Sequence, residues 1–295
     1  MFNDFEITKA KVNGIEINYR IRNSHKTFEN AILFLHGFPQ THVMWSGIAD
    51  KFPESYPIIC PDLRGYGNSG KPSGVENFSF RKMAEDQFQL MFRLGFEKFH
   101  IVGHDRGGRV AHRMALDLTD KIKSITLMDI VPTKLLLSEL TTQVAQSYYH
   151  WLFLAQPSPF PEKLISADPN YFYESCLLGW GSTSLDDFDL EKLIHYRKSW
   201  NNVDTIRAMC DDYRAAIHFD WAFDNEDDKR CLEIPACVMW GKIGAMAKHF
   251  DVPLTWKNKF LNIQKRPMQG GHFFPDQYPK ETKNALVSFI SNNTG

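Results

Sequence analysis

The sequence has no apolar run of the length that a membrane span requires. Its first residues, Met1 to Glu6, also lack the basic and apolar blocks of a secretion signal. Cysteine is scarce: the five thiols are odd in number and scattered without CxxC spacing (Cys60, Cys176, Cys210, Cys231 and Cys237). We therefore expect a cytoplasmic protein with reduced structural cysteines and no bound metal.

An excess of charge of either sign is absent as well. The 34 basic and 35 acidic residues are interspersed and leave a formal net charge of −1. Nothing in this balance favours binding to nucleic acid or to an anionic membrane, so any anion site must be local. The length of 295 residues suits one large core with an insertion and does not require two independent domains.

An aspartate lies in a sharp turn between a buried strand and a helix. Residues 99–104 are predicted to form the strand, and Gly103 and Gly107 flank Asp105. Glycines on both sides permit the strained bend of a nucleophile elbow, which lifts the middle side chain to the C-terminal edge of a parallel sheet. Because an aspartate nucleophile leaves an ester that water can open, we predict displacement at an sp3 carbon followed by ester hydrolysis. The alternative is that Asp105 merely caps the following helix.

Further motifs supply an acid, a base and an oxyanion hole in the order that such an elbow requires. A predicted strand ends at Asp129, and His272 follows two glycines near the C-terminus. Upstream, another apolar run leads into a tight loop that contains Phe38. We expect the backbone N–H groups of Phe38 and Arg106 to stabilise the intermediate of ester hydrolysis.

The pattern of elements predicts an α/β fold. Alternation around Asn13-Gly14 indicates an antiparallel hairpin at the start of the sheet. Helices such as Ser79 to Leu94 and Gly107 to Leu118 should separate parallel strands. These strands are expected near residues 31–36, 57–61, 99–104, 124–129, 235–240 and 261–267.

In the middle of the chain the strand pattern stops. Helical stretches rich in Trp and Tyr are expected there, over 135–153, 169–178, 190–200 and 203–218. We therefore predict a core domain of residues 1–131 and 229–295 and an inserted helical cap of residues 132–228. A lid over the strand ends would exclude water from the nucleophile.

Two arginines follow the nucleophile with a spacing of three. If the helix begins just after the elbow, Arg106 and Arg109 lie on one face of it and point toward the same opening of the predicted site. Two forked donors at a helix N-terminus form a carboxylate site. The alternative is that Arg109 pairs with an acidic neighbour while Arg106 points to solvent.

Taken together, the motifs resemble a known family. The His36-Gly37-Phe38-Pro39 loop, the stretch Pro61 to Ser69, the Asp105 elbow and the late Gly-Gly-His are similar to the α/β-hydrolase superfamily branch of epoxide hydrolases and haloalkane dehalogenases. Within that branch, Arg106 and Arg109 after Asp105, and His150-Trp151 in the cap, resemble the fluoroacetate dehalogenases.

The resemblance implies conversion of a haloacetate, fluoroacetate or chloroacetate, into glycolate and halide without a cofactor. Asp105 would be the nucleophile, His272 the base that activates water, and Asp129 the group that orients the imidazole. Arg106 and Arg109 would bind the substrate carboxylate. The related haloalkane dehalogenases usually have a tryptophan where Arg106 stands, which favours a short carboxylated substrate over an uncharged alkane.

In the resembled family, a His, a Trp and a Tyr of the cap bind the departing halide, and His150, Trp151 and Tyr213 match them here. Such donors suit fluoride, which is strongly hydrated and costly to release without hydrogen bonds. For cap aromatics, packing is the ordinary role and stays the alternative. His104 and Trp180 are predicted to line the pocket, with a purely structural role as the other option for Trp180.

Two rival functions stay open. An epoxide hydrolase would use the same Asp105, Asp129 and His272, with tyrosines of the cap as acids; Tyr148, Tyr149 and Tyr213 are available. A non-catalytic ligand receptor on a hydrolase scaffold is the other. The expected partner is a small haloacid, and a homodimer is one option for an oligomeric state that the sequence leaves open.

Overall fold

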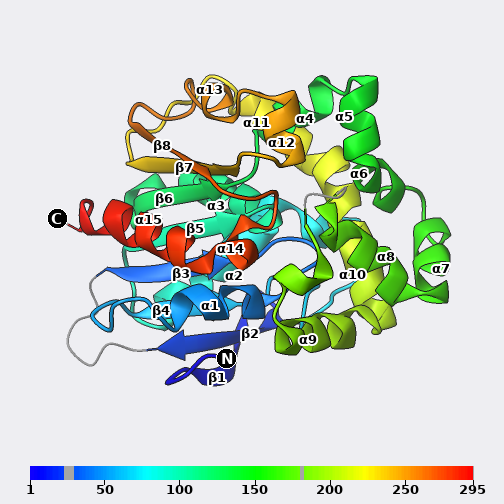
Figure 1. The fold of residues 1–295 in the computed structure, drawn as a ribbon, viewed down its shortest axis with the longest axis horizontal. Helices are drawn as coiled ribbons and strands as arrows, with labels where there is room; N and C mark the ends of the chain where they lie inside the picture. Colours follow the sequence, from blue (N-terminus) through cyan, green and yellow to red (C-terminus); the bar gives the residue numbers. More distant parts are fainter. Residues whose placement is uncertain (23–29, 180–182, 295) are drawn as a thin grey trace.

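A computed structural model describes residues 1–22, 30–179 and 183–294 of the chain. They are organised around one sheet of order β1-β2-β4-β3-β5-β6-β7-β8 (Figure 1). Its strands are β1 (Glu6–Val12), β2 (Ile15–Arg22), β3 (Ala31–Leu35), β4 (Ile58–Pro61), β5 (Phe99–His104), β6 (Ile122–Met128), β7 (Ala236–Gly241) and β8 (Ile263–Met268). β2 pairs antiparallel with β1 and β4, and the pairs from β4 to β8 are parallel. The predicted hairpin and mostly parallel sheet are confirmed.

Helices cover both faces of the sheet (Figure 1). α2 (Phe80–Arg93) and α3 (Arg106–Asp117) pack together on one face, while α1 (Ser46–Ala49), α14 (Phe274–Gln277) and α15 (Pro279–Ser291) lie on the other. Short helices α12 (Ala245–His249) and α13 (Val252–Thr255) follow β7. Short 3-10 turns lie at His42–Trp45, Val75–Phe78, Thr119–Lys121 and Leu185–Asp187.

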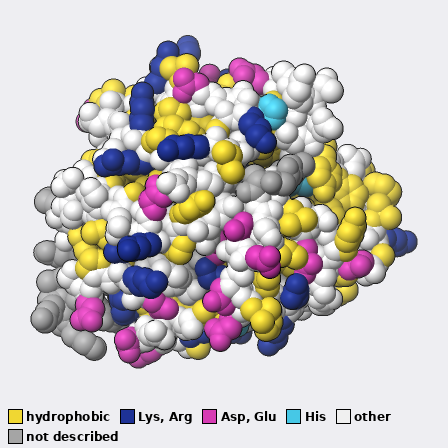
Figure 2. Space-filling model, viewed as in Figure 1, with side chains coloured by type: hydrophobic (Ala, Val, Ile, Leu, Met, Phe, Trp, Pro, Cys, Tyr) yellow, Lys and Arg dark blue, Asp and Glu magenta, His cyan; other side chains and the backbone are white. Residues whose placement is uncertain are grey.

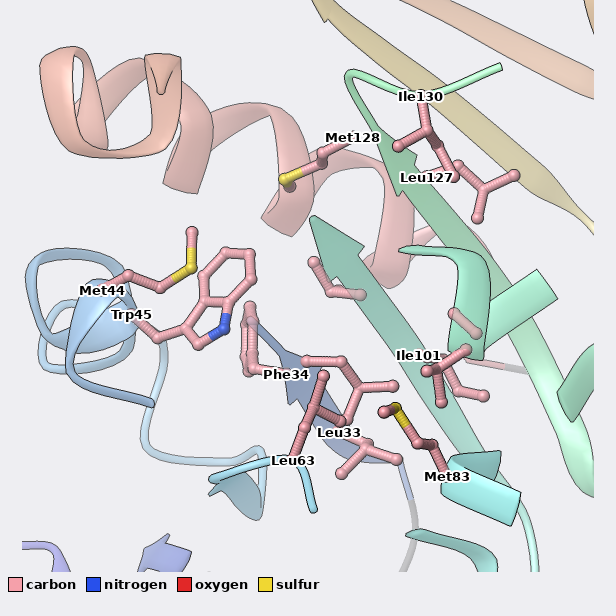
Figure 3. Packing of buried hydrophobic residues seen from close by; sticks show 14 of the residues in the cluster. Leu33, Phe34, Met44, Trp45, Leu63, Met83, Ile101, Leu127, Met128 and Ile130 are labelled. Carbon is pink, nitrogen blue, oxygen red and sulfur yellow. The ribbon is translucent and has the colours of Figure 1, made fainter. Parts of the chain in front are cut away.

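The core lies between the sheet and these helices. Every residue of β3 and β5 is buried, which explains why both strands are close to continuous apolar runs in the sequence. Figure 3 shows the Trp45 indole against the Phe34 ring of β3, with the ring centroids 5.0 Å apart. Met83 of α2 lies beside Ile101 of β5 in the same view. This packing holds the central strands, and therefore their C-terminal ends, in fixed positions.

All regular elements described between β6 and β7 are helices. They are α4 (Thr133–Ser138), α5 (Thr142–Ser147), α6 (Tyr149–Leu154), α7 (Phe160–Ala167), α8 (Pro169–Leu177), α9 (Leu190–Trp200), α10 (Val203–Ala215), a π-helical turn (Ala216–Asp220) and α11 (Trp221–Glu226). They lie beyond the C-terminal ends of the parallel strands (Figure 1). The single stretch expected over 135–153 is three short helices, and α7 and α11 are additional to the prediction. The domain limits of 131, 132, 228 and 229 stay a prediction.

The outer end of the cap carries apolar side chains. Phe160 and Leu164 of α7 and Tyr171 of α8 are exposed, and Figure 2 shows hydrophobic side chains gathered over this end. Exposed apolar clusters are typical of contact surfaces, and the homodimer stays a prediction. None of the described helices combines the length and the apolar character that crossing a membrane requires.

Candidate active site

Asp105 occupies a strained turn between β5 and α3. Its backbone has φ 47° and ψ −117°, outside the regions that L-residues favour. A Cβ on Gly103 would lie 2.4 Å from the carbonyl oxygen of Gly107, and one on Gly107 would lie 2.3 Å from that of Leu35. Both positions therefore require glycine, as the elbow motif predicts. Although Asp105 immediately precedes α3, its side chain makes no capping hydrogen bond, so the helix-cap alternative is wrong.

The loop after β3 brings a backbone donor to the Asp105 carboxylate. The Phe38 N–H donates to Oδ1 of Asp105 at 2.9 Å. His36 fixes this loop, because its Nε2 accepts from the Leu63 N–H at 3.0 Å. Arg106 is the first residue of α3, and the N–H groups of a first helical turn have no intrahelical acceptor. Both predicted oxyanion-hole residues therefore lie next to Asp105.

His272 and Asp129 complete a chain of hydrogen-bonding groups at the strand ends. Nδ1 of His272 donates to Oδ2 of Asp129 at 2.6 Å, and the Gly241 N–H donates to Oδ1 of Asp129 at 3.0 Å. Nε2 of His272 is 4.0 Å from Oδ2 of Asp105, too far for a direct hydrogen bond. The other ring nitrogen of His272, Nε2, therefore lies on the side of the ring that is near Asp105.

The electrostatics suit these roles. Burial alone would raise the pKa of Asp105, but nearby positive charges, with His272 first among them, lower it to about 2. Burial lowers the pKa of His272, whereas its hydrogen bond to Asp129 and the charges of Asp129 and Asp105 raise it, and the net shift is upward. Asp105 is therefore a buried but ionised carboxylate at neutral pH.

Arg106 and Arg109 lie on one face of α3 but differ in their partners. Arg106 is fully buried and donates from Nε (3.0 Å) and Nη2 to the carboxylate of Asp212 in α10. Arg109 uses Nη1 to hold the carbonyl of Val131 and the hydroxyl of Thr133, both at 3.0 Å. The alternative derived from the sequence is therefore wrong, because Arg106 is neither exposed nor free of an acidic partner.

Three buried nitrogens of these arginines have no hydrogen-bond partner in the described part of the chain: Nη1 of Arg106, and Nε and Nη2 of Arg109. Nε and Nη2 form one edge of a guanidinium, the edge that binds a carboxylate in a two-pronged manner. In Arg106 this edge is occupied by Asp212, whereas in Arg109 neither nitrogen of this edge has a hydrogen-bond partner among the described residues. The charges of both arginines contribute to lowering the pKa of Asp105, which indicates that they are close to it.

The three predicted halide ligands come together above Phe38. His150 stacks on the Phe38 ring with centroids 5.9 Å apart, and Tyr213 meets the same ring edge-on at 5.1 Å. Trp151 meets Tyr213 edge-on at 5.2 Å. The Tyr213 hydroxyl is buried and makes no hydrogen bond to any described residue. Burial lowers the pKa of His150 to about 3, so the ring is neutral and carries one N–H.

A small cavity lies beside Asp105, with a volume of about 20 Å³, which is room for little more than one water molecule. It is lined by Phe38, Pro39, Asp105, Tyr148, His150, Cys176, Gly179, Ala245, His272 and Phe273. The arginines, Trp151 and Tyr213 are not part of this lining. With the cap as it stands, only a very small molecule fits beside Asp105.

The sequence-based view of the cavity wall requires correction. His104 was predicted to line the pocket but is not part of the cavity lining. It is fully buried, and its Nε2 is 2.9 Å from the backbone carbonyl of His272, so it supports the loop that carries His272. Trp180 falls outside the described residues. Cys176 and Phe273 of the lining carry no sequence motif, and neither does Asp212, whose partner Arg106 is 106 positions away.

Comparisons with known proteins agree with this architecture. The family profile described as alpha/beta hydrolase fold matches residues 30–279. A fluoroacetate dehalogenase from Burkholderia sp. is 45% identical over 99% of this chain and 96% of its own length. A soluble epoxide hydrolase from Corynebacterium sp. (strain C12) is 28% identical over 97% of this chain and 98% of its own. The crystal structure of a protein from Nostoc sp. PCC 7120 superimposes with a TM-score of 0.94, at 39% identity and 99% coverage of both chains.

Proposed function

The chain belongs to the α/β-hydrolase fold family, and we propose that it is a haloacetate dehalogenase that converts fluoroacetate or chloroacetate into glycolate and halide. The observation that carries the proposal is that Nε and Nη2 of Arg109 are buried close to an ionised Asp105 and have no hydrogen-bond partner among the described residues. A carboxylate on that edge would have its neighbouring carbon near the nucleophile. The similarity to a fluoroacetate dehalogenase supports the same substrate class. A cytoplasmic location stays a prediction.

In the first step, Oδ2 of Asp105 attacks the carbon that bears the halogen. The carbon–halogen bond breaks, the halide leaves with the bonding electron pair, and an ester forms between Asp105 and the acetate unit. No proton moves in this step, so the low pKa of Asp105 supplies the reactive ionised form directly. His150, Trp151 and Tyr213 are assigned to the departing halide, and Tyr213 has an uncommitted hydroxyl for it.

In the second step, water opens the ester. His272 takes a proton from water through Nε2 while Asp129 stabilises the imidazolium through Nδ1. The water oxygen attacks the carboxyl carbon of Asp105, and the negative charge develops on Oδ1, which the Phe38 N–H already contacts. Collapse of this intermediate expels glycolate, which receives the proton from His272. The second proton of the water stays on the Asp105 carboxyl group, whose low pKa releases it to solvent and restores the carboxylate.

A direct assay tests the proposal. Purified enzyme should release fluoride from fluoroacetate or chloride from chloroacetate, with glycolate formed in equal amount. In a single turnover in water labelled with heavy oxygen, the label should enter the Asp105 carboxylate. Label found only in glycolate would contradict the covalent route.

Epoxide hydrolysis is the second candidate, and one observation favours keeping it in the assay. Tyr148 lines the cavity beside Asp105, whereas Tyr149 is 41% exposed and does not reach it. A small epoxide therefore serves as a parallel substrate. Opening of the epoxide without any halide release would replace the dehalogenase proposal, and binding of haloacetate without turnover would favour a receptor.

The acid side of the pH profile should separate the two steps. The pKa of His272 lies above its ordinary value of 6.5, and only the neutral imidazole can act as the base. Ester hydrolysis should therefore slow as the pH falls through that pKa, while displacement by Asp105 continues. Rapid-quench experiments should show a larger initial burst of halide at mildly acidic than at mildly alkaline pH. Equal slowing of both steps would contradict this division of labour.

Tyr213→Phe should harm defluorination more than dechlorination. Fluoride gains more from hydrogen bonds than chloride does, and the variant removes only the buried hydroxyl. We expect fluoroacetate turnover to fall by roughly tenfold or more, with a smaller loss on chloroacetate, as measured by ion-selective electrodes.

Tyr173→Phe is the matched control for this experiment. Tyr173 is also buried, has an uncommitted hydroxyl and meets the Phe38 ring edge-on at 5.7 Å, but the charge of Asp105 contributes to the raised pKa of Tyr213 and not to that of Tyr173. Equal losses on the two halides in Tyr213→Phe would mean that Tyr213 only shapes the cap.

A further inference from the structure

The charge of Arg106 is held by a carboxylate that comes from the cap. Asp212 of α10 accepts from Nε of Arg106 at 3.0 Å and from Nη2, and its backbone carbonyl accepts from Nη2 at 2.9 Å. Both side chains are fully buried. A two-pronged pair of this kind fixes the plane of the guanidinium as well as its position.

Neighbouring groups restrict the pair further. The Tyr66 hydroxyl donates to Oδ2 of Asp212 at 2.6 Å, so a residue of the core also holds the carboxylate. The guanidinium carbon of Arg106 lies 4.6 Å from the ring centroid of Phe80, 4.8 Å from that of Trp151 and 4.2 Å from that of Tyr213. Rotation of the guanidinium would disturb these ring contacts as well as the ion pair.

This arrangement decides which atoms of Arg106 can reach a ligand. With Nε and Nη2 committed to Asp212, Nη1 is the position of this guanidinium that no described residue engages. For a substrate, Arg106 therefore has only Nη1 available, whereas Arg109 has both Nε and Nη2 available. The two arginines differ in the nitrogens available to a ligand, because Asp212 engages Nε and Nη2 of Arg106.

We propose that Asp212, supported by Tyr66, is a positioning residue for substrate specificity: it holds Arg106 so that Nη1 faces the carboxylate that Arg109 grips, and it fixes the adjacent Tyr213 over the same site. The assignment rests on the proposed dehalogenase function. Both carboxylate oxygens of Asp212 are engaged by Arg106 and Tyr66, so the effect of Asp212 on the substrate passes through Arg106.

Asp212→Asn tests the assignment, because it preserves the shape of the side chain but removes its charge and one acceptor. We expect the KM for chloroacetate to rise by roughly tenfold or more, in line with the loss of one charge-assisted contact, with a smaller change in kcat. The Kd of acetate, measured by calorimetry, should rise by a similar factor. Circular dichroism establishes that the variant is folded.

Asp211→Asn is the matched control. Asp211 is the preceding residue of the same helix, is also buried, and pairs with Arg207 at 3.1 Å and Arg214 at 2.8 Å instead of with Arg106. It should leave KM and the Kd of acetate unchanged. Equal effects of the two variants would overturn the assignment.

A double-mutant cycle separates positioning from general damage to the fold. In an Arg106→Met background, Asp212→Asn should change kcat/KM no further, because the group through which it acts is gone. Tyr66→Phe, which keeps the ion pair, covers the case in which Asp212→Asn does not fold, and should raise KM in the same direction by a smaller factor. An additive cycle, or an unchanged KM in Tyr66→Phe, would overturn the assignment. A parent enzyme inert to all haloacetates would instead overturn the proposed function, and this assignment with it.

Discussion

His272→Ala should stop turnover and leave the enzyme carrying a carboxymethyl ester on Asp105. The displacement step needs only the ionised carboxylate, whose pKa is lowered to about 2 mainly by surrounding positive charges, whereas ester hydrolysis needs a base. Removal of a positioned general base typically costs a factor of roughly 10²–10⁴. Mass spectrometry of the intact protein after incubation with chloroacetate should therefore show the added group, and peptide mapping should place it on Asp105.

The charge balance strengthens this expectation. Among the neighbouring charges, that of His272 lowers the pKa of Asp105 most. Its loss raises that pKa, but the arginines remain and keep the carboxylate ionised at neutral pH. His249→Ala is a suitable control, since His249 contacts Ser147 at 2.9 Å and does not line the cavity. An inactive His272→Ala protein without added mass would mean that the base is needed before the attack.

Arg109→Lys should raise the KM for haloacetates by about one to two decades. A lysine ammonium can replace the charge of Arg109 but not its open Nε and Nη2 edge, and the loss of a charge-assisted pair costs about 1.5–3 kcal/mol. Since this contact is made in the ground state and the transition state alike, kcat should fall less than KM rises. Steady-state kinetics on chloroacetate measure both.

Arg113→Lys provides the comparison for Arg109→Lys. Arg113 lies one turn further along α3 and pairs with Asp117 and Asp227, each at 2.6 Å, at a distance from the cavity lining. It should leave KM near the parent value. Haloacetamide adds a second check, because an uncharged amide handled by the parent as well as the acid would contradict a carboxylate site.

The sequence predicted the centre of the sheet closely because β3, β4 and β5 are buried on both faces. Such strands appear as short apolar runs, and β3 and β5 lie within one residue of their expected limits. The elbow could be predicted equally well from the sequence, because other parts of the backbone approach Gly103 and Gly107 so closely that no other residue fits there. Local steric requirements of this kind leave a direct trace in the sequence.

In the cap, α8 and α9 lie within one residue of their expected limits, whereas the region before α8 was harder to predict because α4, α5, α6 and α7 are short helices. The break before α5 carries a local signal, since Thr141 caps that helix by accepting from the Val144 N–H at 3.3 Å. The start of α7 has prolines at Pro159 and Pro161, which suit a first helical turn but also resemble a loop.

The unequal roles of the arginines had no sequence signal at all. Spacing in α3 placed Arg106 and Arg109 on one face, but the partner of Arg106 is 106 residues away in the cap. A pattern of residues along one helix gives the direction of a side chain and not the group that meets it. For the same reason, the sequence did not predict that Cys176 lines the cavity.

The ion pair between Arg106 and Asp212 also limits how caps can be exchanged between relatives. A chimera that joins this core to a foreign cap without an acid at the position of Asp212 would leave a guanidinium buried and uncompensated, which costs about 3–5 kcal/mol. Loss of this single ion pair would therefore remove a large fraction of the free energy of unfolding of a typical domain. Libraries that exchange the cap to change halide preference therefore need to retain an acid at the position of Asp212.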